Sequence, residues 1–144
     1  MQLETAHFGV IDVDEADIIY FPEGIPGFEN SKRYKLIRHD EGDSVFFWLQ
    51  SVDMPELCFV VTDPFMVYDG YGVDIDDEDV KLLEITDANK VLTLTIVVIP
   101  ENLDEIRVNL KAPIIINTEK KLGKQIIQQN ENLPIRYYLK SSVK

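Results

Sequence analysis

The sequence predicts a mainly β fold, a single-domain antiparallel β-barrel-like structure with one or two short helices. Short runs of β-branched and aromatic residues recur along the 144 residues, and turn residues end each run. Only one segment carries strong helix signals. Because the chain is 45% hydrophobic and has no linker, internal repeat or low-complexity tract, residues 1–144 are expected to form one domain with one core.

The spacing of apolar residues predicts the strands. In 34–38 and 107–111 polar positions interleave with apolar ones, as in a strand with one buried face. The run 91–99 begins with alternation and ends wholly apolar, so we expect it to begin at a solvated edge and end in the core. The expected strands are 8–13, 18–21, 34–38, 45–50, 57–62, 91–99, 106–110, 114–117, 125–128 and 135–139.

A specific turn is predicted after the run 18–21, in the segment Gly24-Ile25-Pro26-Gly27-Phe28-Glu29. Gly24 and Gly27 tolerate positive φ, and Pro26 fixes its own φ and favours an extended residue before it. No catalytic group lies in this segment. Its glycines and proline therefore indicate a role in architecture.

One helix is expected over 76–83. Asp76 can cap its first turn, and the acidic residues that follow suit the positive end of the helix dipole. Val80 and Leu83 would then face inward.

Charge narrows the classes of partner. Acidic residues outnumber basic ones by 26 to 14, a formal net charge of -12, and such a surface repels phosphate, so direct nucleic-acid binding is not expected. Residues 1–31 contain seven acidic residues and no Lys or Arg, whereas basic residues outnumber acidic ones from Thr118 onward. The acidic potential therefore lies in the N-terminal and central segments, where it favours a basic protein partner, although a role in solubility alone stays open.

Cysteine usage and the N-terminal segment indicate the compartment. Cys58 is the only cysteine and lies among apolar residues, so we expect a buried small hydrophobe in a reducing cytosol. The N-terminal segment lacks the basic and apolar regions of a signal peptide, and no stretch approaches 18 uninterrupted apolar residues. A cytoplasmic protein that does not span a membrane is expected.

The chain also lacks the residue patterns of known catalytic and metal sites. His7 and His39 have no second ligand at helical spacing, and no zinc-protease, serine-hydrolase or phosphate-loop motif occurs. The acidic run lacks the central Gly and closing Glu of a calcium loop. We expect no catalytic residue, cofactor or metal. An enzyme would need His7 or a carboxylate with a perturbed pKa in a deep pocket.

A nucleic-acid-binding barrel is the main rival interpretation. The aromatic residues of such a barrel are usually interleaved with Lys and Arg. Here Phe46, Phe47 and Trp48 lie among acidic and aliphatic residues, which favours a protein-interaction role.

Candidate partner contacts lie in an acidic run and two apolar segments. Pro64, Gly70 and Gly72 break regular structure, so a loop could present nearby aromatic residues to a partner, although core positions would also explain them. The residues 114–116 are all apolar, and consecutive residues of a strand face opposite ways, so both faces of this strand must be covered. The favoured interpretation is that the core covers them, and the alternative is that a partner does. The acidic candidates are Asp74, Asp76, Asp77, Glu78 and Asp79, and the apolar ones are Phe65, Tyr68, Tyr71, Ile114 and Ile116.

Several motifs occur in a fixed order along the chain. They are Phe21-x2-Gly24-Ile25-Pro26-Gly27-Phe28-Glu29, Phe47-Trp48-Leu49-Gln50-Ser51, Phe59-Val60-Val61-Thr62-Asp63-Pro64 and Asn109-Leu110-Lys111-Ala112-Pro113-Ile114-Ile115-Ile116-Asn117, followed by Gly123-Lys124-Gln125 and Tyr137-x-Leu139. As an ordered set they resemble the flagellar assembly factor FliW family from about residue 3 to 140.

The resemblance implies a small cytoplasmic β-barrel-like protein without catalytic activity that works in bacterial flagellar assembly. Members of the family bind flagellin at its C-terminal helical region and bind CsrA, a basic RNA-binding dimer that represses translation of flagellin messenger RNA. Export of flagellin frees FliW to capture CsrA, and accumulated flagellin occupies FliW and releases CsrA. The resemblance implies that FliW acts on CsrA allosterically, away from the RNA-binding surface of CsrA. Flagellin and CsrA are thus the expected partners, with another basic protein as the alternative.

Two hypotheses assign the candidate contacts. The acidic run would steer CsrA, and an amphipathic helix of flagellin would meet apolar residues around 65–71 or 114–116. No coiled-coil heptad or long flat apolar edge strand demands self-association, so a monomer is expected.

Most motif residues are interpreted as architectural. Buried Asn and Gln side chains are expected to satisfy backbone groups at strand edges, with partner contact as the alternative for Gln50, Asn109 and Asn117. The architectural set is Gly24, Ile25, Pro26, Gly27, Phe28, Trp48, Gln50, Asn109, Pro113 and Asn117.

Overall fold

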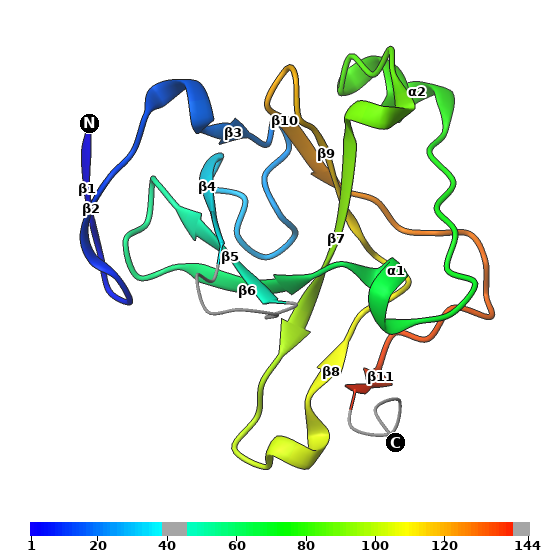
Figure 1. Cartoon of the computed structure of the whole chain (residues 1–144). Helices are drawn as coiled ribbons and strands as arrows, with labels where there is room; N and C mark the ends of the chain where they lie inside the picture. The colour runs from blue at the N-terminus through cyan, green and yellow to red at the C-terminus, as the bar shows by residue number, and fades with distance from the viewer. Residues whose placement is uncertain (39–45, 140–144) are drawn as a thin grey trace.

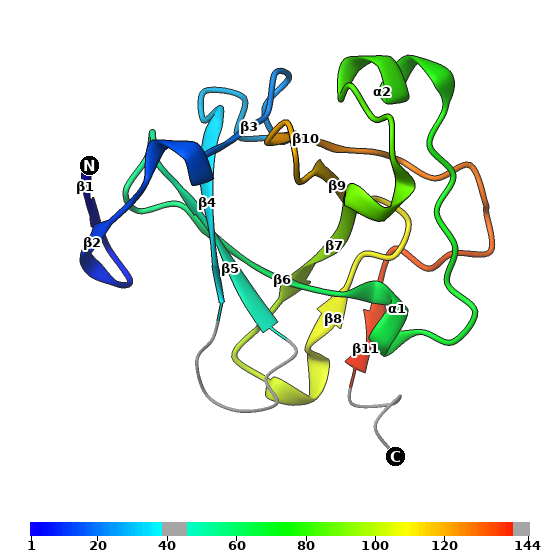
Figure 2. The same cartoon turned by 45° about the horizontal axis from the view of Figure 1, so that its top comes forward.

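Seven strands form a closed barrel in the computed structural model, which describes residues 1–38 and 46–139 (Figures 1 and 2). Neighbouring strands follow the order β7-β6-β5-β4-β3-β10-β9, and β9 pairs with β7 to close the ring. The barrel strands are β3 (Ile19–Tyr20), β4 (Arg33–Arg38), β5 (Phe46–Ser51), β6 (Cys58–Thr62), β7 (Val91–Val98), β9 (Ile114–Asn117) and β10 (Leu122–Gln125).

All barrel pairs are antiparallel except one. β10 pairs with β3 in parallel through Leu122 and Tyr20, next to a hydrogen bond of 2.8 Å from Tyr20 N to Lys121 O. The side chain of Phe21 lies directly against Gly123 of β10: a Cβ on Gly123 would be 2.6 Å from the ring. A glycine is therefore needed where this ring packs under the strand.

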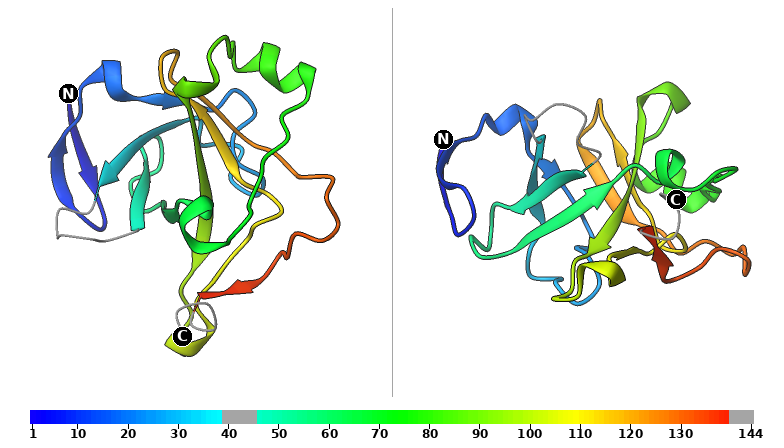
Figure 3. Two further views of the ribbon diagram at one scale, coloured as in Figure 1. Left: turned by 45° about the vertical axis from the view of Figure 1, so that its right-hand side comes forward. Right: turned by 60° about the horizontal axis from the view of Figure 1, so that its bottom comes forward.

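Two strands extend the sheet beyond the barrel, and a hairpin lies apart from it. β8 (Arg107–Val108) pairs with the end of β7, and β11 (Tyr137–Tyr138) pairs with β8. β1 (Gln2–Thr5) and β2 (Gly9–Asp12) form a separate two-stranded sheet. This hairpin and the two helices lie on opposite sides of the barrel (Figure 3).

The helices are short. They are α1 (Pro64–Val67) and α2 (Asp77–Leu82), with single 3-10 turns η1 (Glu15–Asp17), η2 (Ala88–Lys90) and η3 (Leu103–Glu105). Each begins after a residue whose side-chain oxygen accepts from a backbone N–H: Asp14, Asp63, Asp76, Asp87 or Asn102. Short polar caps thus set where each of these turns begins.

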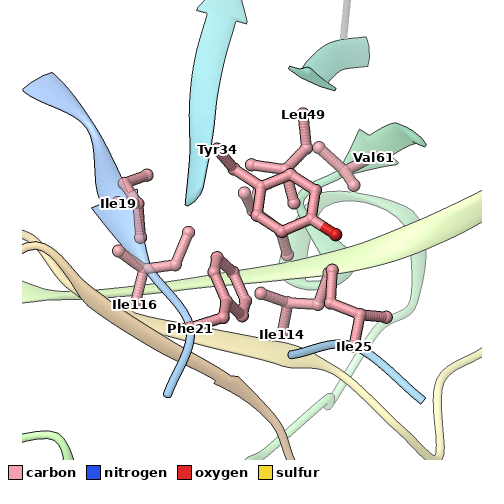
Figure 4. Packing of buried hydrophobic residues seen from close by; sticks show 9 residues of the cluster. Ile19, Phe21, Ile25, Tyr34, Leu49, Val61, Ile114 and Ile116 are labelled. Atoms are coloured by element: carbon pink, nitrogen blue, oxygen red, sulfur yellow. The ribbon is translucent and has the colours of Figure 1, made fainter. Parts of the chain in front are cut away.

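The barrel core is made of inward-facing residues of six strands and of the turn after β3. Tyr34, Leu49, Val61 and their neighbours point toward one another in the interior (Figure 4). Its members, all buried, are Ile19, Phe21, Ile25, Tyr34, Leu49, Val61, Leu94, Ile114 and Ile116.

Three further clusters are separate from this core, one of them made of Leu3, Val13 and Val52. A second core under β8 and β11 contains Tyr71, Val97, Val108, Leu110, Leu133 and Leu139. A cluster under α2 contains Leu83, Ile115 and Ile126. The triplet 114–116 is therefore covered on both faces by core, the favoured interpretation of its sequence.

The predicted fold class is confirmed, and most strands fall where the sequence places them. β1 was not expected, because in Gln2–Thr5 only Leu3 is a large apolar residue. Val45, expected to begin a strand, lies outside the described residues. The strands expected at 106–110 and 135–139 are shorter, as β8 and β11.

The strand expected at 125–128 is wrong, because the ladder of β10 occupies Leu122–Gln125. Beyond it, the N–H groups of Ile126 and Gln128 donate to Pro113 O and Lys111 O. Pro113 has no N–H to donate in return, so a two-way ladder cannot continue past Gln125.

The expectation that the apolar end of 91–99 lies in the core is also wrong. Val98 and Ile99 are 42% and 48% exposed. β7 runs past the barrel to pair with β8, where only the face that carries Val97 is covered.

Candidate protein-interaction surface

The segment around α1 presents aromatic residues at different depths. Asp63 caps the helix by accepting from Phe65 N at 2.8 Å, and Pro64 occupies its first turn. Phe65 and Met66 project outward, 51% and 68% exposed, so at least one ring of this segment is at the surface. Tyr68 is half-buried.

Tyr71 is a core residue. Its hydroxyl donates to Leu110 O at 2.7 Å, and burial raises its pKa to about 12. The Phe65 ring packs edge-on against the Tyr71 ring, with centroids 5.3 Å apart. The buried tyrosine thus supports the exposed phenylalanine and is not available to a partner itself.

The acidic segment, residues 72–79, follows: residues 72–76 belong to no helix or strand, and 77–79 form the first turn of α2. Val73 and Ile75 pack toward the cluster under α2, while Asp74 and Asp76 alternate with them and are exposed. This two-residue period turns acidic side chains outward and apolar ones inward.

The predicted helix is confirmed as α2. Asp76 caps it by accepting from Asp79 N at 3.0 Å. Leu83 is buried and Val80 is half-buried, as expected for the inward face.

An apolar groove of about 520 Å³ lies between α1, α2 and the outer side of β7. We call it the outer groove. Its walls are Phe65, Val73, Ile75, Val80, Ile85, Ala88, Val91 and Thr93. The structure thus brings one predicted aromatic contact, Phe65, to the same depression as the apolar side of the acidic segment.

Three polar side chains hold the acidic segment and α2 to the barrel: Asn117 of β9, Lys124 of β10 and Gln128, three residues after β10. The buried Gln128 amide accepts from Asp74 N at 2.8 Å and donates to Asp74 O at 3.1 Å. Asn117 donates to Leu83 O at 2.8 Å and Glu84 O at 3.1 Å. We call these contacts, with the Lys124 ion pair below, the polar clips.

The third clip is an ion pair between Lys124 and Asp79. Lys124 Nζ lies 2.5 Å from Asp79 Oδ1 and 3.8 Å from Glu23 Oε1. The hydrogen bond to Asp79 raises the pKa of Lys124, because it favours the charged ammonium. Asp79 is only 6% exposed. It forms an internal ion pair and, unlike the other predicted acidic contacts, is not available to a partner. Asp74, Asp76, Asp77 and Glu78 are exposed.

Besides Tyr71, two more of the predicted apolar contacts do not reach the surface. Ile114 and Ile116 are 0% and 1% exposed and belong to the barrel core. No partner could meet them unless the barrel opened, because their strand alternates between two covered faces. Of the predicted apolar contacts, Phe65 is exposed and lines the outer groove.

The motif residues make defined contacts with the backbone. In the turn after β3, Gly24 and Gly27 have φ of +68° and +90°, and a Cβ on Gly24 would be 2.8 Å from Glu29 Cα. Glu29 accepts from Gly27 N at 2.8 Å, and this hydrogen bond lowers the pKa of its carboxyl. Ile25 is buried while Pro26 is exposed.

The amide side chains of the motifs bond to backbone groups. Gln50 donates to Ser51 O, Pro55 O and Leu57 O. Asn109 accepts from Lys111 N and Ala112 N, and Asn117 Oδ1 accepts from Glu119 N and Lys120 N. Phe28 packs edge-on against Phe59, Trp48 packs against Phe8, and Pro113 is buried.

His7 lies in an apolar pocket of about 280 Å³ with Phe8, Trp48, Cys58 and Val60, and no carboxylate of the described residues lines it. Burial raises the pKa of the half-buried Cys58 thiol to about 11, so the thiol is protonated at neutral pH. Over residues 1–38 and 46–139, no three His, Cys, Asp or Glu side chains are grouped to hold a metal ion. None of the helices in the same ranges is long and apolar enough to cross a membrane.

Sequence reasoning missed the polar clips and most of the groove. Gln128 and Lys124 lie far along the chain from the segment they hold, and nothing local marks their partners. The groove has a local signal, the alternation Val73-Asp74-Ile75-Asp76, which indicates an extended segment with one apolar face.

Together these features define a small, acidic, closed β-barrel protein with an apolar groove on its outer wall. The chain belongs to the FliW family of flagellar assembly factors, since the family described as "FliW protein" matches residues 2–139.

Individual relatives agree with this assignment. The chain is 48% identical over 132 residues to the flagellar assembly factor FliW of Caldicellulosiruptor saccharolyticus, covering 92% of this chain and 86% of that one. It is 45% identical over 144 residues to that of Caldanaerobacter subterraneus subsp. tengcongensis, covering 100% and 96%. A crystal structure of the flagellar assembly factor FliW superposes with a TM-score of 0.88 at 37% identity, covering 96% of each chain.

Proposed function

We propose that this protein is a cytoplasmic, non-catalytic factor that binds flagellin and CsrA and works by partner switching. Flagellin that has not been exported occupies the protein. Once flagellin is exported, the free protein captures CsrA and relieves CsrA repression of flagellin translation. Membership of the FliW family supports the flagellar setting of this proposal.

The single observation that carries the proposal is the outer groove beside the exposed acids. An amphipathic helix needs an apolar groove, and Phe65 is the kind of exposed aromatic anchor that contributes most to such interfaces. We assign the groove to the helical region of flagellin.

The acidic residues around the groove are assigned to CsrA. Asp74, Asp77 and Glu78 are exposed and lie within five residues of one another. A concentrated negative field speeds encounter with a basic protein and orients it, although each exposed ion pair adds only about 0 to 1 kcal/mol. Their effect is therefore expected mainly in the association rate.

A groove variant tests the flagellin assignment. Phe65→Ser should weaken flagellin binding about tenfold, since truncating an interface anchor removes its packing. Leu103→Ser is the matched control, because Leu103 is also exposed, at 63%, and lies outside the groove. Equal flagellin affinity in the two folded variants would remove the groove from the proposal.

A charge variant tests the CsrA assignment. The triple variant Asp74→Lys, Asp77→Lys and Glu78→Lys should slow CsrA association and flatten its dependence on salt. The control reverses Glu101, Glu105 and Glu131, which are exposed elsewhere and change the net charge by the same amount. Equal rate constants and salt slopes in the two variants would contradict the assignment and leave another basic partner as the alternative.

A further inference from the structure

A second pocket lies on the opposite side of β7 from the outer groove. Because side chains alternate along a strand, Val91 and Thr93 line the outer groove while Leu92 and Leu94 line this pocket. Its volume is about 490 Å³, within the range of small-molecule sites. We call it the inner pocket.

The floor of the inner pocket is continuous with the barrel core. Leu36 of β4, Phe47 of β5 and Leu92 are half-buried residues packed against that core, and Leu94 belongs to it. The floor is therefore apolar and is built on rigid paired strands, with Leu36 and Phe47 on two adjacent ones.

The rim of the inner pocket carries two cations in a chain of net charge -12. They are Arg38, at the end of β4, and Lys121, in the turn between β9 and β10. The Arg38 guanidinium lies 5.8 Å from the centroid of the Phe47 ring. Within residues 1–38 and 46–139, no carboxylate lies within 4.0 Å of the charged nitrogens of either residue.

The backbone of Lys121 is held in an unusual conformation. Its φ is +56°, in the left-handed region that side-chain-bearing residues seldom adopt. Its N–H donates to Asn117 O at 2.9 Å and its carbonyl accepts from Tyr20 N at 2.8 Å. Both peptide groups are thus fixed, which sets the direction in which the lysine leaves the turn.

Among the residues that the structure describes, the remaining polar side chain of the rim, Thr118, is already engaged. Thr118 Oγ1 donates its proton to Lys90 O at 2.8 Å, so it has none left for an anion. A smaller pocket of about 200 Å³ adjoins through Leu36, Leu92 and Lys121, and there Lys35 lies 3.7 Å from Asp17. Anion recognition in the inner pocket would therefore rest on Arg38 and Lys121.

We propose that the inner pocket binds a carboxylate carried on an apolar chain or side chain. The apolar part would lie on Leu36, Phe47 and Leu92, and the carboxylate would meet Arg38 and Lys121, since guanidinium and ammonium groups are the favoured carboxylate partners. A free fatty acid and the carboxy-terminal residue of a peptide share this chemistry. The site does not depend on the function proposed above.

Decanoate is the first probe, and its binding is measured by the changes in the amide chemical shifts of the full chain. Shifts should concentrate at Leu36, Leu92 and Lys121. Decanol has the same chain and no charge. It should bind at least about fivefold more weakly, because it loses both ion pairs and one partly exposed ion pair alone contributes up to about that factor. A peptide ending in leucine with a free carboxylate, beside its amidated form, is the second arm and distinguishes the two sources.

Two variants complete the test. Lys121→Asn removes the charge and keeps a residue that tolerates positive φ, so it should weaken decanoate binding about fivefold and leave decanol unchanged. Lys120→Asn is the matched control, since Lys120 is exposed and does not line the pocket. Decanol that binds as tightly as decanoate, or the absence of shifts at the pocket with every probe, would overturn the proposal.

Discussion

Leu92 and Leu94 on the inner side of β7 pack into the barrel core or against it, whereas Val91 and Thr93 on the outer side lie at the outer groove. The inner side is fixed by apolar packing between paired strands. The outer side is fixed by a few polar clips that hold the acidic segment and α2 to β9 and β10. The comparison teaches that the barrel core and the outer groove have different structural supports, so substitutions in the core should leave the shape of the groove unchanged.

The largest effect is expected in the barrel core. Ile114→Ala should lower the free energy of unfolding by about 3 to 4 kcal/mol, since it removes a fully buried aliphatic side chain and leaves a cavity. Urea unfolding measures the loss. At low temperature, where the variant is still folded, its affinity for flagellin should equal that of the unsubstituted protein. A lower affinity in the folded variant would mean that the core supports binding directly.

A close contact under β10 should give the next effect. Gly123→Ala places a Cβ 2.6 Å from the Phe21 ring, and the ring or strand must shift. The expected loss of stability is about 2 kcal/mol, typical of overpacking. Gly72→Ala is the control, because no atom lies within 4 Å of its added Cβ. Similar midpoints of thermal unfolding for the two variants would show that Phe21 moves aside freely.

The polar clips should affect binding more than the core does. Gln128→Ala removes both hydrogen bonds to the Asp74 backbone and should cost about 1 to 2 kcal/mol of stability. It should also weaken binding at the outer groove, because Val73 on its wall is next to the released residue. Hydrogen exchange at residues 72–79 checks the release, with Gln129→Ala, an exposed neighbour, as the control. Unchanged exchange would contradict the role of this clip.

The smallest effect concerns pH. Burial raises the pKa of the Asp53 carboxyl, but hydrogen bonds from Lys32 N and from the Arg33 backbone and side chain outweigh it, so the pKa is lowered in the folded state. A lowered pKa stabilises the fold at pH values above the pKa of the carboxyl in the unfolded chain, about 3.9. This stabilisation is lost as pH falls through the lower folded pKa.

Asp53→Asn should therefore be less stable than the unsubstituted protein at pH 7, by about 1 kcal/mol or less. The difference should shrink as the pH falls below about 4. Unfolding curves at several pH values measure it. A difference that stays constant down to pH 2 would show that the carboxylate charge contributes nothing.

The barrel was predictable because its signals are local. Runs of β-branched and aromatic residues mark each central strand, and Gly24 and Gly27 mark the turn that needs positive φ. The acidic run and the cap at Asp76 were likewise visible in the sequence. Failures occurred where a distant residue decides the outcome, as Pro113 does for the end of β10.

The candidate site was predictable only in part. Phe65 is exposed as a partner contact requires, but the same local pattern could not distinguish it from the buried Tyr71. Asp79 looks like its acidic neighbours in sequence and differs only because Lys124, 45 residues away, pairs with it. Burial and pairing depend on tertiary neighbours, which a single sequence does not reveal.

Competition between the partners tests the proposed switch most directly. Purified CsrA is titrated calorimetrically into the protein, first alone and then after saturation with flagellin. The account predicts CsrA binding that flagellin abolishes. CsrA binding that survives saturation with flagellin would contradict it, because the two partners would then occupy separate and compatible sites.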